Sequence, residues 1–251
     1  MNNILCIIQA RMSSTRLPGK ILKEAGGMSL LEYEIRRVRR AKMIDKIVIA
    51  TTAKPEDDKA AQLSEKLDLE CFRGSEDDVL DRYYQCALRY PEYDSIVRIT
   101  GDCPLIDPRV IDQAIVFFQQ GDYDYVSNAS PPTFPDGMDT EIFTRESLAA
   151  AWRKARLSSE REHATLYIVK SGKFKTGNVR AEKDYSRYRL TVDNPEDFEV
   201  IAFLIEHAAP DADFREYIKL LEANPEIMAK NMAIQRNEGL AKSLKEDKQL
   251  T

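Results

Sequence analysis

Short runs of apolar, largely β-branched residues alternate with amphipathic stretches along the first half of the chain. Nearly every position of an apolar run is hydrophobic, which predicts strands of a parallel sheet buried on both faces. The amphipathic stretches repeat their apolar residues at helical spacing. The expected strands are residues 4–9, 46–52, 70–74, 94–100 and 123–128, and the expected helices are residues 29–41, 56–68, 77–90 and 109–120. This order predicts an α/β fold with a largely parallel, doubly wound, Rossmann-like sheet.

The regular alternation of predicted strands and helices is interrupted over residues 130–176. A turn-rich loop is followed by a short strand at residues 140–144 and by helical stretches at residues 145–155 and 161–172. We expect a small insertion subdomain here, serving as a substrate lid or a dimerisation segment, although a plain connection also fits.

The sheet pattern returns with a predicted strand at residues 187–192 and a helix that begins at Asn194 and Pro195. The tail, residues 224–251, is polar and helical, and Gly239 is expected to break it. We expect the last dozen residues to be frayed or to depend on a partner. The whole chain, residues 1–251, is predicted to be a single domain.

Composition narrows the class of protein. Apolar residues make up 43% of the 251 residues and charged residues 31%, with no apolar run long enough for a membrane helix. The N-terminus lacks the features of a signal peptide, so we expect a cytoplasmic protein. A net charge of -5 argues against a dedicated nucleic-acid binder. The four cysteines have no CxxC spacing and lie in or beside apolar segments, which predicts buried thiols.

Three cations, Arg11, Arg16 and Lys20, stand among hydroxyls in "RMSSTRLPGK", directly after the first predicted strand. Open α/β sheets bind ligands beyond the carboxyl ends of their strands. A phosphate chain needs cationic donors and a backbone that allows close approach, and this segment offers both. The segment matches neither GxxxxGK[ST] nor GxGxxG. We therefore predict a phosphate-binding loop of another kind, with a solvated surface loop as the alternative.

The stretch "QARMSSTRLPGK" is similar to the N-terminal signature of the CMP-sugar synthetases. These are cytidylyltransferases for acidic sugars such as sialic acid and Kdo, and they include a spore-coat polysaccharide branch. "FRGSEDDVLDRYYQCA", "RITGDCPLIDP", "FPDGMDTEIFTRESL", "SEREHATLYI" and "RLTVDNPEDFEVI" resemble that branch in order and spacing. The resemblance implies a nucleotidyltransferase fold, a homodimer, and Mg²⁺-dependent transfer of CMP from CTP to an acidic, ulosonic-type sugar for surface polysaccharide.

The resemblance also assigns roles to residues. It places the triphosphate of CTP on Arg11, Ser13, Ser14, Arg16 and Lys20, with Ala10 and Arg11 near the base. A second group would help define the nucleotide pocket: Arg73, Gly74, Ser75, Asp81 and Arg82. Asp139 and Glu141, in the carboxylate-rich turn "FPDGMDTE", would face the sugar. From the residues alone, an ordinary capped helix explains the second group equally well, and a solvated loop explains the carboxylate-rich turn better.

Two aspartates are candidates for holding a metal. Asp102 follows Gly101 at the end of the strand at residues 94–100, and Asp193 follows the predicted strand at residues 187–192. Strand ends can bring such carboxylates together, and Mg²⁺ prefers hard oxygen ligands, although each aspartate also suits a turn or helix start. The resemblance implies that both bind Mg²⁺. We expect Lys20, Arg16 and the metal to stabilise the leaving pyrophosphate, and the metal or a nearby carboxylate to deprotonate the attacking sugar hydroxyl.

Other functions stay open at this point. A nucleotidyltransferase using another nucleotide has the same fold, and a glycosyltransferase would place a DxD pair such as Asp122 and Asp124 at a strand end. A non-catalytic nucleotide-binding module is a third possibility. An acidic sugar needs cations, for which the candidates are Arg98, Arg161, Arg187 and Arg189. His163, expected on a helix, is by itself a packed or surface residue.

Overall fold

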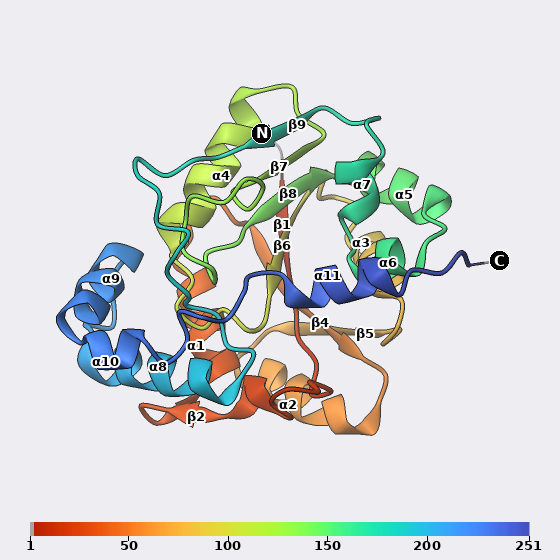
Figure 1. The fold of residues 1–251 in the computed structure, drawn as a ribbon. Helices are drawn as coiled ribbons and strands as arrows, with labels where there is room; N and C mark the ends of the chain where they lie inside the picture. Colours follow the sequence, from red (N-terminus) through yellow and green to blue (C-terminus); the bar gives the residue numbers. More distant parts are fainter. Residues whose placement is uncertain (1–2, 251) are drawn as a thin grey trace.

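A computed structural model describes residues 3–250 and confirms the predicted fold class (Figure 1). Its central sheet has seven strands in the order β5-β4-β1-β6-β8-β7-β9. Strand β8 is antiparallel to its two neighbours, and the other pairs of neighbouring strands are parallel. The strands are β1 Ile4–Gln9, β4 Lys46–Thr52, β5 Glu70–Gly74, β6 Ser95–Thr100, β7 Tyr125–Ser127, β8 Glu141–Thr144 and β9 Thr176–Asn178, and a small hairpin adds β2 Glu24–Ala25 and β3 Met28–Ser29.

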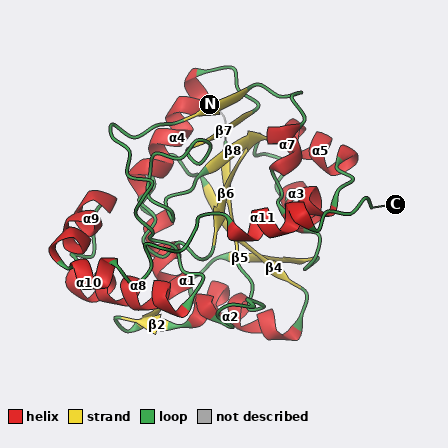
Figure 2. Cartoon of the chain, in the orientation of Figure 1, coloured by secondary structure: helices red, strands yellow, loops and turns green. Residues whose placement is uncertain are grey.

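Helices cover both faces of the sheet, as Figure 2 shows in the same orientation. They are α1 Leu30–Val38, α2 Asp58–Lys66, α3 Val79–Leu88, α4 Pro108–Gln120, α5 Arg145–Lys154, α6 Ser158–Glu162, α7 Leu166–Lys170, α8 Pro195–His207, α9 Phe214–Ala223, α10 Pro225–Met228 and α11 Glu238–Lys245, with 3-10 turns η1 Lys20–Leu22 and η2 Pro55–Asp57. Among residues 3–250, none of these helices is long and apolar enough to cross a membrane.

The strands divide their side chains between two cores. Ile4, Cys6 and Ile8 of β1 point into a large core shared with α1, α4 and α8. Leu5 and Ile7 point to the opposite face, where α3, α5 and α7 pack. This period of two explains why the strands are apolar throughout. All four cysteines are free thiols, and three of them are buried as predicted, whereas Cys71 is half-buried.

Residues 130–176 contribute to the central sheet and to the second core. Their strand β8 lies between β6 and β7 in the central sheet, and side chains of α5 and α7 belong to the second core. The segment therefore shares the sheet and core of the rest of the chain. Its role as a lid or dimerisation segment stays a prediction.

The strand predicted at residues 187–192 is wrong. Only Arg189 forms a bridge there, an isolated one with Asp136. The amide of Leu190 donates to the carbonyl of Asp136 (2.7 Å) and that of Val192 to the carbonyl of Asp102 (2.9 Å), so both bonds go to loops rather than to a strand. Leu190 and Val192 are buried in the large core, which is why the segment has a strand-like pattern.

The expectations for the tail and for His163 are also corrected. Gly239 lies inside α11 and does not break it, and His163 caps the end of α6 rather than lying within a helix. The described part of the last dozen residues, 240–250, contacts the rest of the fold, and whether it frays or depends on a partner stays a prediction. The carboxylate of Asp247 accepts hydrogen bonds from the amide (3.0 Å) and hydroxyl (2.8 Å) of Ser159 at the start of α6. The tail therefore has its own docking point on the fold.

Candidate active site

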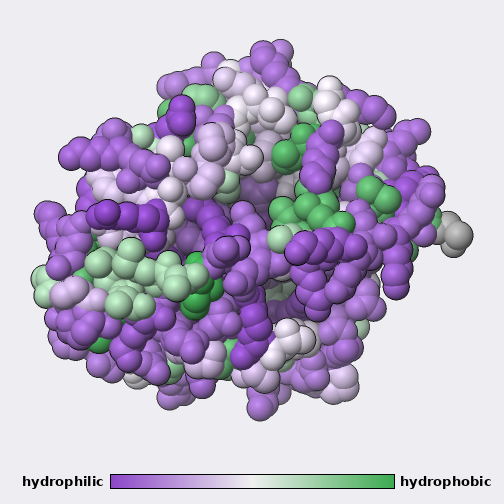
Figure 3. All heavy atoms as spheres, in the orientation of Figure 1, coloured by the Kyte–Doolittle hydropathy of each residue, from purple (hydrophilic) through white to green (hydrophobic). Residues whose placement is uncertain are grey.

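Two adjoining cavities lie where β1 and β6 end. The larger has a volume of about 810 Å³ and the smaller about 400 Å³. Arg16, Asp102, His163 and Asp193 line both. Figure 3 shows that hydrophilic residues dominate this face of the molecule and that a hollow lies near its centre. A ligand with two chemically different parts would suit two joined cavities of these volumes.

The loop after β1 folds back on itself to form one wall of the larger cavity. The carbonyl of Met12 accepts hydrogen bonds from the amides of Ser14 (2.9 Å) and Gly19 (3.1 Å). Gly19 has φ +67°, a left-handed conformation that favours glycine, and Lys20 then begins η1. All the loop residues predicted to contact the nucleotide line this cavity: Ala10, Arg11, Ser13, Ser14, Arg16 and Lys20.

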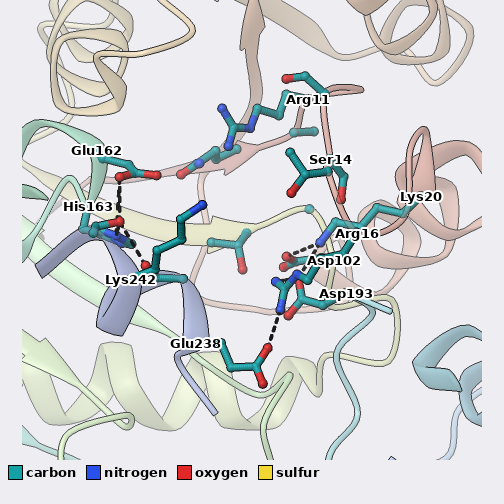
Figure 4. Close-up of a pocket in the computed structure, with 18 of the residues that line it drawn as sticks. Arg11, Ser14, Arg16, Lys20, Asp102, Glu162, His163, Asp193, Glu238 and Lys242 are labelled. Atoms are coloured by element: carbon teal, nitrogen blue, oxygen red, sulfur yellow. Dashed lines mark hydrogen bonds and ion pairs between the residues drawn. The ribbon is translucent and has the colours of Figure 1, made fainter. Parts of the chain in front are cut away.

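Lys20 joins the two predicted metal-binding aspartates. Its Nζ lies 2.8 Å from Oδ2 of Asp102 and 2.9 Å from Oδ1 of Asp193 (Figure 4). Burial alone would lower the pKa of Lys20, but the two carboxylates raise it above its ordinary value. Burial likewise opposes ionisation of Asp102, yet Lys20 holds the pKa of that carboxyl at about 2. Lys20 and Asp102 are therefore charged together at neutral pH.

Gly101 permits the approach that places Asp102. Its amide donates to the carbonyl of Gln9 (2.7 Å), and a Cβ at this position would lie 2.9 Å from the same oxygen. The carbonyl of Asp102 in turn accepts from the amide of Val192 (2.9 Å) and the hydroxyl of Thr191 (3.1 Å). These bonds fix the segment before Asp193 beside the end of β6.

Arg189 holds Asp193 from the other side. Its guanidinium donates to Asp193 (2.9 Å), Asp136 (2.7 Å) and Asp197 (2.8 Å), and its side chain is only 5% exposed. Asp197 also accepts from the amides of Asp193 (3.0 Å) and Asn194 (2.9 Å) at the start of α8. Arg189 is thus a positioning residue for Asp193.

Asp139 and Glu141 line the smaller cavity, together with Arg98. Burial raises the pKa of Asp139 to about 7, even though the Arg236 guanidinium acts in the opposite direction. Burial would also raise the pKa of Glu141, but Arg98 and hydrogen-bond donors lower it below its ordinary value. Asp139 and Glu141 therefore titrate in different pH ranges.

The arginines predicted to meet an acidic sugar already have carboxylate partners. Arg98 pairs with Glu141 and Arg189 with the three aspartates described above. Arg161 pairs with Asp78 and Arg187 with Glu222. Arg16 lines both cavities and its nearest partners are Asp193 (2.8 Å) and the half-exposed Glu238 (2.9 Å).

The second predicted group surrounds the start of α3 and lines neither cavity: Arg73, Gly74, Ser75, Asp81 and Arg82. Arg73 donates to the carbonyls of Thr52 (3.0 Å) and Lys54 (2.7 Å). Asp81 accepts from the indole of Trp152 (2.8 Å). Arg82 is fully buried and donates to the carbonyl of Ser75 (2.6 Å). Their part in a nucleotide pocket stays a prediction.

The sequence pattern of the cytidylyltransferase family matches residues 5–234. The chain belongs to the cytidylyltransferase family. The matched region contains the loop after β1, both aspartates that hold Lys20, and Asp139. This cytidylyltransferase is accordingly an enzyme of the nucleotidyltransferase class.

Individual relatives agree with that membership. The cytidylyltransferase is 39% identical over 238 residues to the spore coat polysaccharide biosynthesis protein SpsF of Bacillus subtilis, covering 90% of this chain and 97% of the relative. It is 36% identical over 115 residues to a 3-deoxy-manno-octulosonate cytidylyltransferase of Geobacter sulfurreducens, covering 45% of this chain and 44% of that one. A solved cytidylyltransferase structure from Leptospira borgpetersenii is 35% identical, with a TM-score of 0.87, and the match covers 94% of this chain and 100% of that one.

The glycosyltransferase interpretation loses its structural basis as well. Asp122 and Asp124 precede β7 and line neither cavity of the cytidylyltransferase. Asp122 is fully exposed, and Asp124 accepts a hydrogen bond from the amide of Lys175 (2.8 Å).

Sequence reasoning missed the contribution of the C-terminal segment to the site. Glu238 and Lys242 of α11 line the larger cavity, and Arg236 pairs with Asp139. The i, i+4 spacing of Glu238 and Lys242 on one face of a helix was the available signal. Because the tail was expected to be frayed or to depend on a partner, its side chains were not predicted to line the site.

Proposed function

We propose that this cytidylyltransferase transfers CMP from CTP to a hydroxyl group of an acidic, ulosonic-type sugar, with Mg²⁺, and releases pyrophosphate. The observation that carries the proposal is the placement of Lys20 between Asp102 and Asp193, beside a loop lined with Arg11 and Arg16. Cations and a carboxylate pair meet there at one cavity. Transfer of a nucleotidyl group depends on such positioning and charge neutralisation more than on a protein nucleophile.

The two aspartates fit a magnesium ion. Oδ2 of Asp102 and Oδ1 of Asp193 both lie within hydrogen-bond distance of one atom, Lys20 Nζ, so the carboxylates face a common point. Mg²⁺ commonly takes one or two carboxylates and completes its octahedron with substrate phosphates and water. When bound, the ion would neutralise developing charge on the phosphate oxygens.

The chain's own groups supply orientation and charge. In the reaction, a sugar hydroxyl oxygen forms a bond to the α-phosphorus while the bond from that phosphorus to the α–β bridging oxygen breaks. Arg16 and Lys20 stabilise the charge that passes to the leaving pyrophosphate. Asp139 is suited to accept the proton of the attacking hydroxyl, because it lines the smaller cavity and has a pKa of about 7.

The smaller cavity is the proposed site of the sugar. Its arginines are paired, so the carboxylate of an acidic sugar needs a cation whose present partner exchanges easily. Arg16, which lines both cavities, meets this condition at Nη1, because the partner of that nitrogen, Glu238, is 45% exposed, and exposed ion pairs are weak. The similarity to a spore coat polysaccharide protein supports a role in making surface polysaccharide. We also propose that the enzyme works in the cytoplasm as a homodimer.

Pyrophosphate release tests this function. The protein is incubated with Mg²⁺ and CTP, UTP, GTP or ATP, each combined with a panel of 3-deoxy-ulosonic acids and sugar phosphates. We expect release with CTP and one acidic sugar. The variant Asp102→Asn should lose activity by at least about 100-fold, as when one charge-stabilising group of an active site is removed. Asp122→Asn, a change at an exposed aspartate away from the cavities, is the matched control.

Each outcome has a distinct meaning. Release with CTP and only sugar phosphates would remove the acidic sugar and keep the transfer of CMP. Release only with another nucleotide would contradict the function. Equal losses in Asp102→Asn and Asp122→Asn would contradict the assignment of the site.

A further inference from the structure

Helix α11 lies outside the region that the family pattern matches, yet it forms part of the cavity wall. The match ends at residue 234, and α11 spans Glu238–Lys245. In Figure 1 this helix and the segment before it cross in front of β1 and β6. The residues after it are fixed to α6, because the amide of Ser158 donates to the carbonyl of Lys248 (2.8 Å) and Asp247 binds Ser159. The helix is therefore held at the cavity from its C-terminal side.

One face of α11 is turned to the cavity. Glu238, Lys242 and Glu246 line the larger cavity, at the i, i+4 spacing of one helical face, whereas Lys245 does not. Ser243 on the same side binds His163 (3.1 Å) and Glu162 (2.7 Å) of α6. These contacts of Ser243, and those of the segment after α11, fix the helix that carries Lys242 beside the cavity.

Lys242 extends into the cavity toward Arg11, as the close-up shows (Figure 4). Both side chains line the larger cavity. Within residues 3–250 neither Lys242 nor Arg11 forms an ion pair, whereas Arg16 and Lys20 have carboxylate partners. Glu238, Glu246 and Glu162 line the same cavity, but neither cation pairs with them, so both charges are available to an anion of the ligand.

We propose that Lys242 is a further binding residue of this site and contacts the polyphosphate part of the nucleotide from the wall opposite the loop after β1. The inference rests on the proposed function, since it takes CTP as the ligand. Lysine binds phosphate as a point charge on a flexible stem, so no rigid geometry is required of an exposed residue. The site then holds the polyphosphate between the first loop of the chain and its last helix.

Inorganic pyrophosphate is the probe, because it carries the phosphates without the base or the reaction. Its binding to the full-length protein is measured by calorimetry for the wild type, Lys242→Met and Lys245→Met. Lys245 is the matched control, being the same residue type on the same helix and absent from the cavity lining. We expect Lys242→Met to weaken pyrophosphate binding about tenfold, as for loss of a charged hydrogen bond, and Lys245→Met to bind as the wild type does.

Equal affinities in the wild type and Lys242→Met would overturn the proposal, and so would equal losses in both variants, which would indicate a general charge effect. Absence of pyrophosphate binding to the wild type would overturn it too. Loss of binding in Lys242→Met alone, in a protein that releases no pyrophosphate from CTP, would keep the proposal and contradict the proposed function. Normal turnover together with unchanged pyrophosphate binding in Lys242→Met would contradict the role of Lys242 and keep the proposed function.

Discussion

Replacing Lys20 by methionine removes the cation between Asp102 and Asp193 and keeps the length of the side chain. Asp102 then loses both the charge and the hydrogen bond that hold its pKa at about 2. Asp193 keeps its contacts with Arg16 and Arg189. The substitution therefore leaves one carboxylate without its counter-ion beside another carboxylate.

The structure gives the size of the effect. Removing one partner of a fully buried ion pair costs about 3–5 kcal/mol. The side chains of Asp102 and Asp193 are 25% and 21% exposed, so water screens part of the loss. We expect Lys20→Met to lower the free energy of unfolding by about 1–3 kcal/mol in the absence of metal. Activity should fall by at least about 100-fold, because Lys20 would also stabilise the leaving pyrophosphate.

Urea denaturation with and without Mg²⁺ measures this effect. Mg²⁺ would bind the same two carboxylates and supply positive charge that Lys20→Met has lost, so it should stabilise Lys20→Met more than the wild type. Lys59→Met, on the exposed side of α2, should change neither stability nor its dependence on Mg²⁺. If Lys20→Met were as stable as the wild type and its stability did not depend on Mg²⁺, the reasoning about this cluster would be refuted.

Three further changes test the electrostatics of the site. The pKa of Asp139, raised to about 7 by burial, should appear as an inflection near that pH in an NMR titration, and Arg236→Met should move it higher because the guanidinium lowers it. Burial raises the pKa of Glu34 well above its ordinary value, so this group stabilises the fold at low pH and loses that contribution as the pH rises through its folded-state pKa. Glu34→Gln should therefore be more stable relative to the wild type at pH 9 than at pH 5 in urea denaturation, and a pH-independent difference would contradict this. Arg189→Met should cost about 3–5 kcal/mol of unfolding free energy by leaving the fully buried Asp197 unpaired, and a loss below about 1 kcal/mol would show that water or other donors compensate.

Much of the fold could be predicted because strands buried on both faces have continuous apolar sequences. The strand predicted at residues 187–192 is wrong because burial alone gives a segment a strand-like pattern. Its alternate residues Leu190 and Val192 are buried as in a strand, but their amides bond to loop carbonyls. The position of β8 as an antiparallel strand inside the sheet depends on pairing with β6 and β7, which periodicity does not specify.

The candidate site divides in a similar way. The loop residues and Asp102 come directly after buried strands in the chain, so the sequence predicted their position at the correct edge of the sheet. Asp81 is one of the residues predicted for the nucleotide pocket, but it contacts Trp152 outside both cavities. Lys242 belongs to a polar segment whose position depends on a distant contact between Asp247 and Ser159. Such long-range polar contacts leave no periodic signal in the sequence.

Formation of a CMP-linked sugar from CTP, followed by phosphorus NMR, tests the central claim most directly. With the wild type, Mg²⁺ and an acidic sugar, we expect a phosphodiester signal and pyrophosphate to appear in equal amounts. Asp102→Asn should form neither, and Asp122→Asn should form both at the wild-type rate. Pyrophosphate without a CMP-linked sugar, or equal product from Asp102→Asn and the wild type, would contradict the proposed transfer at this site.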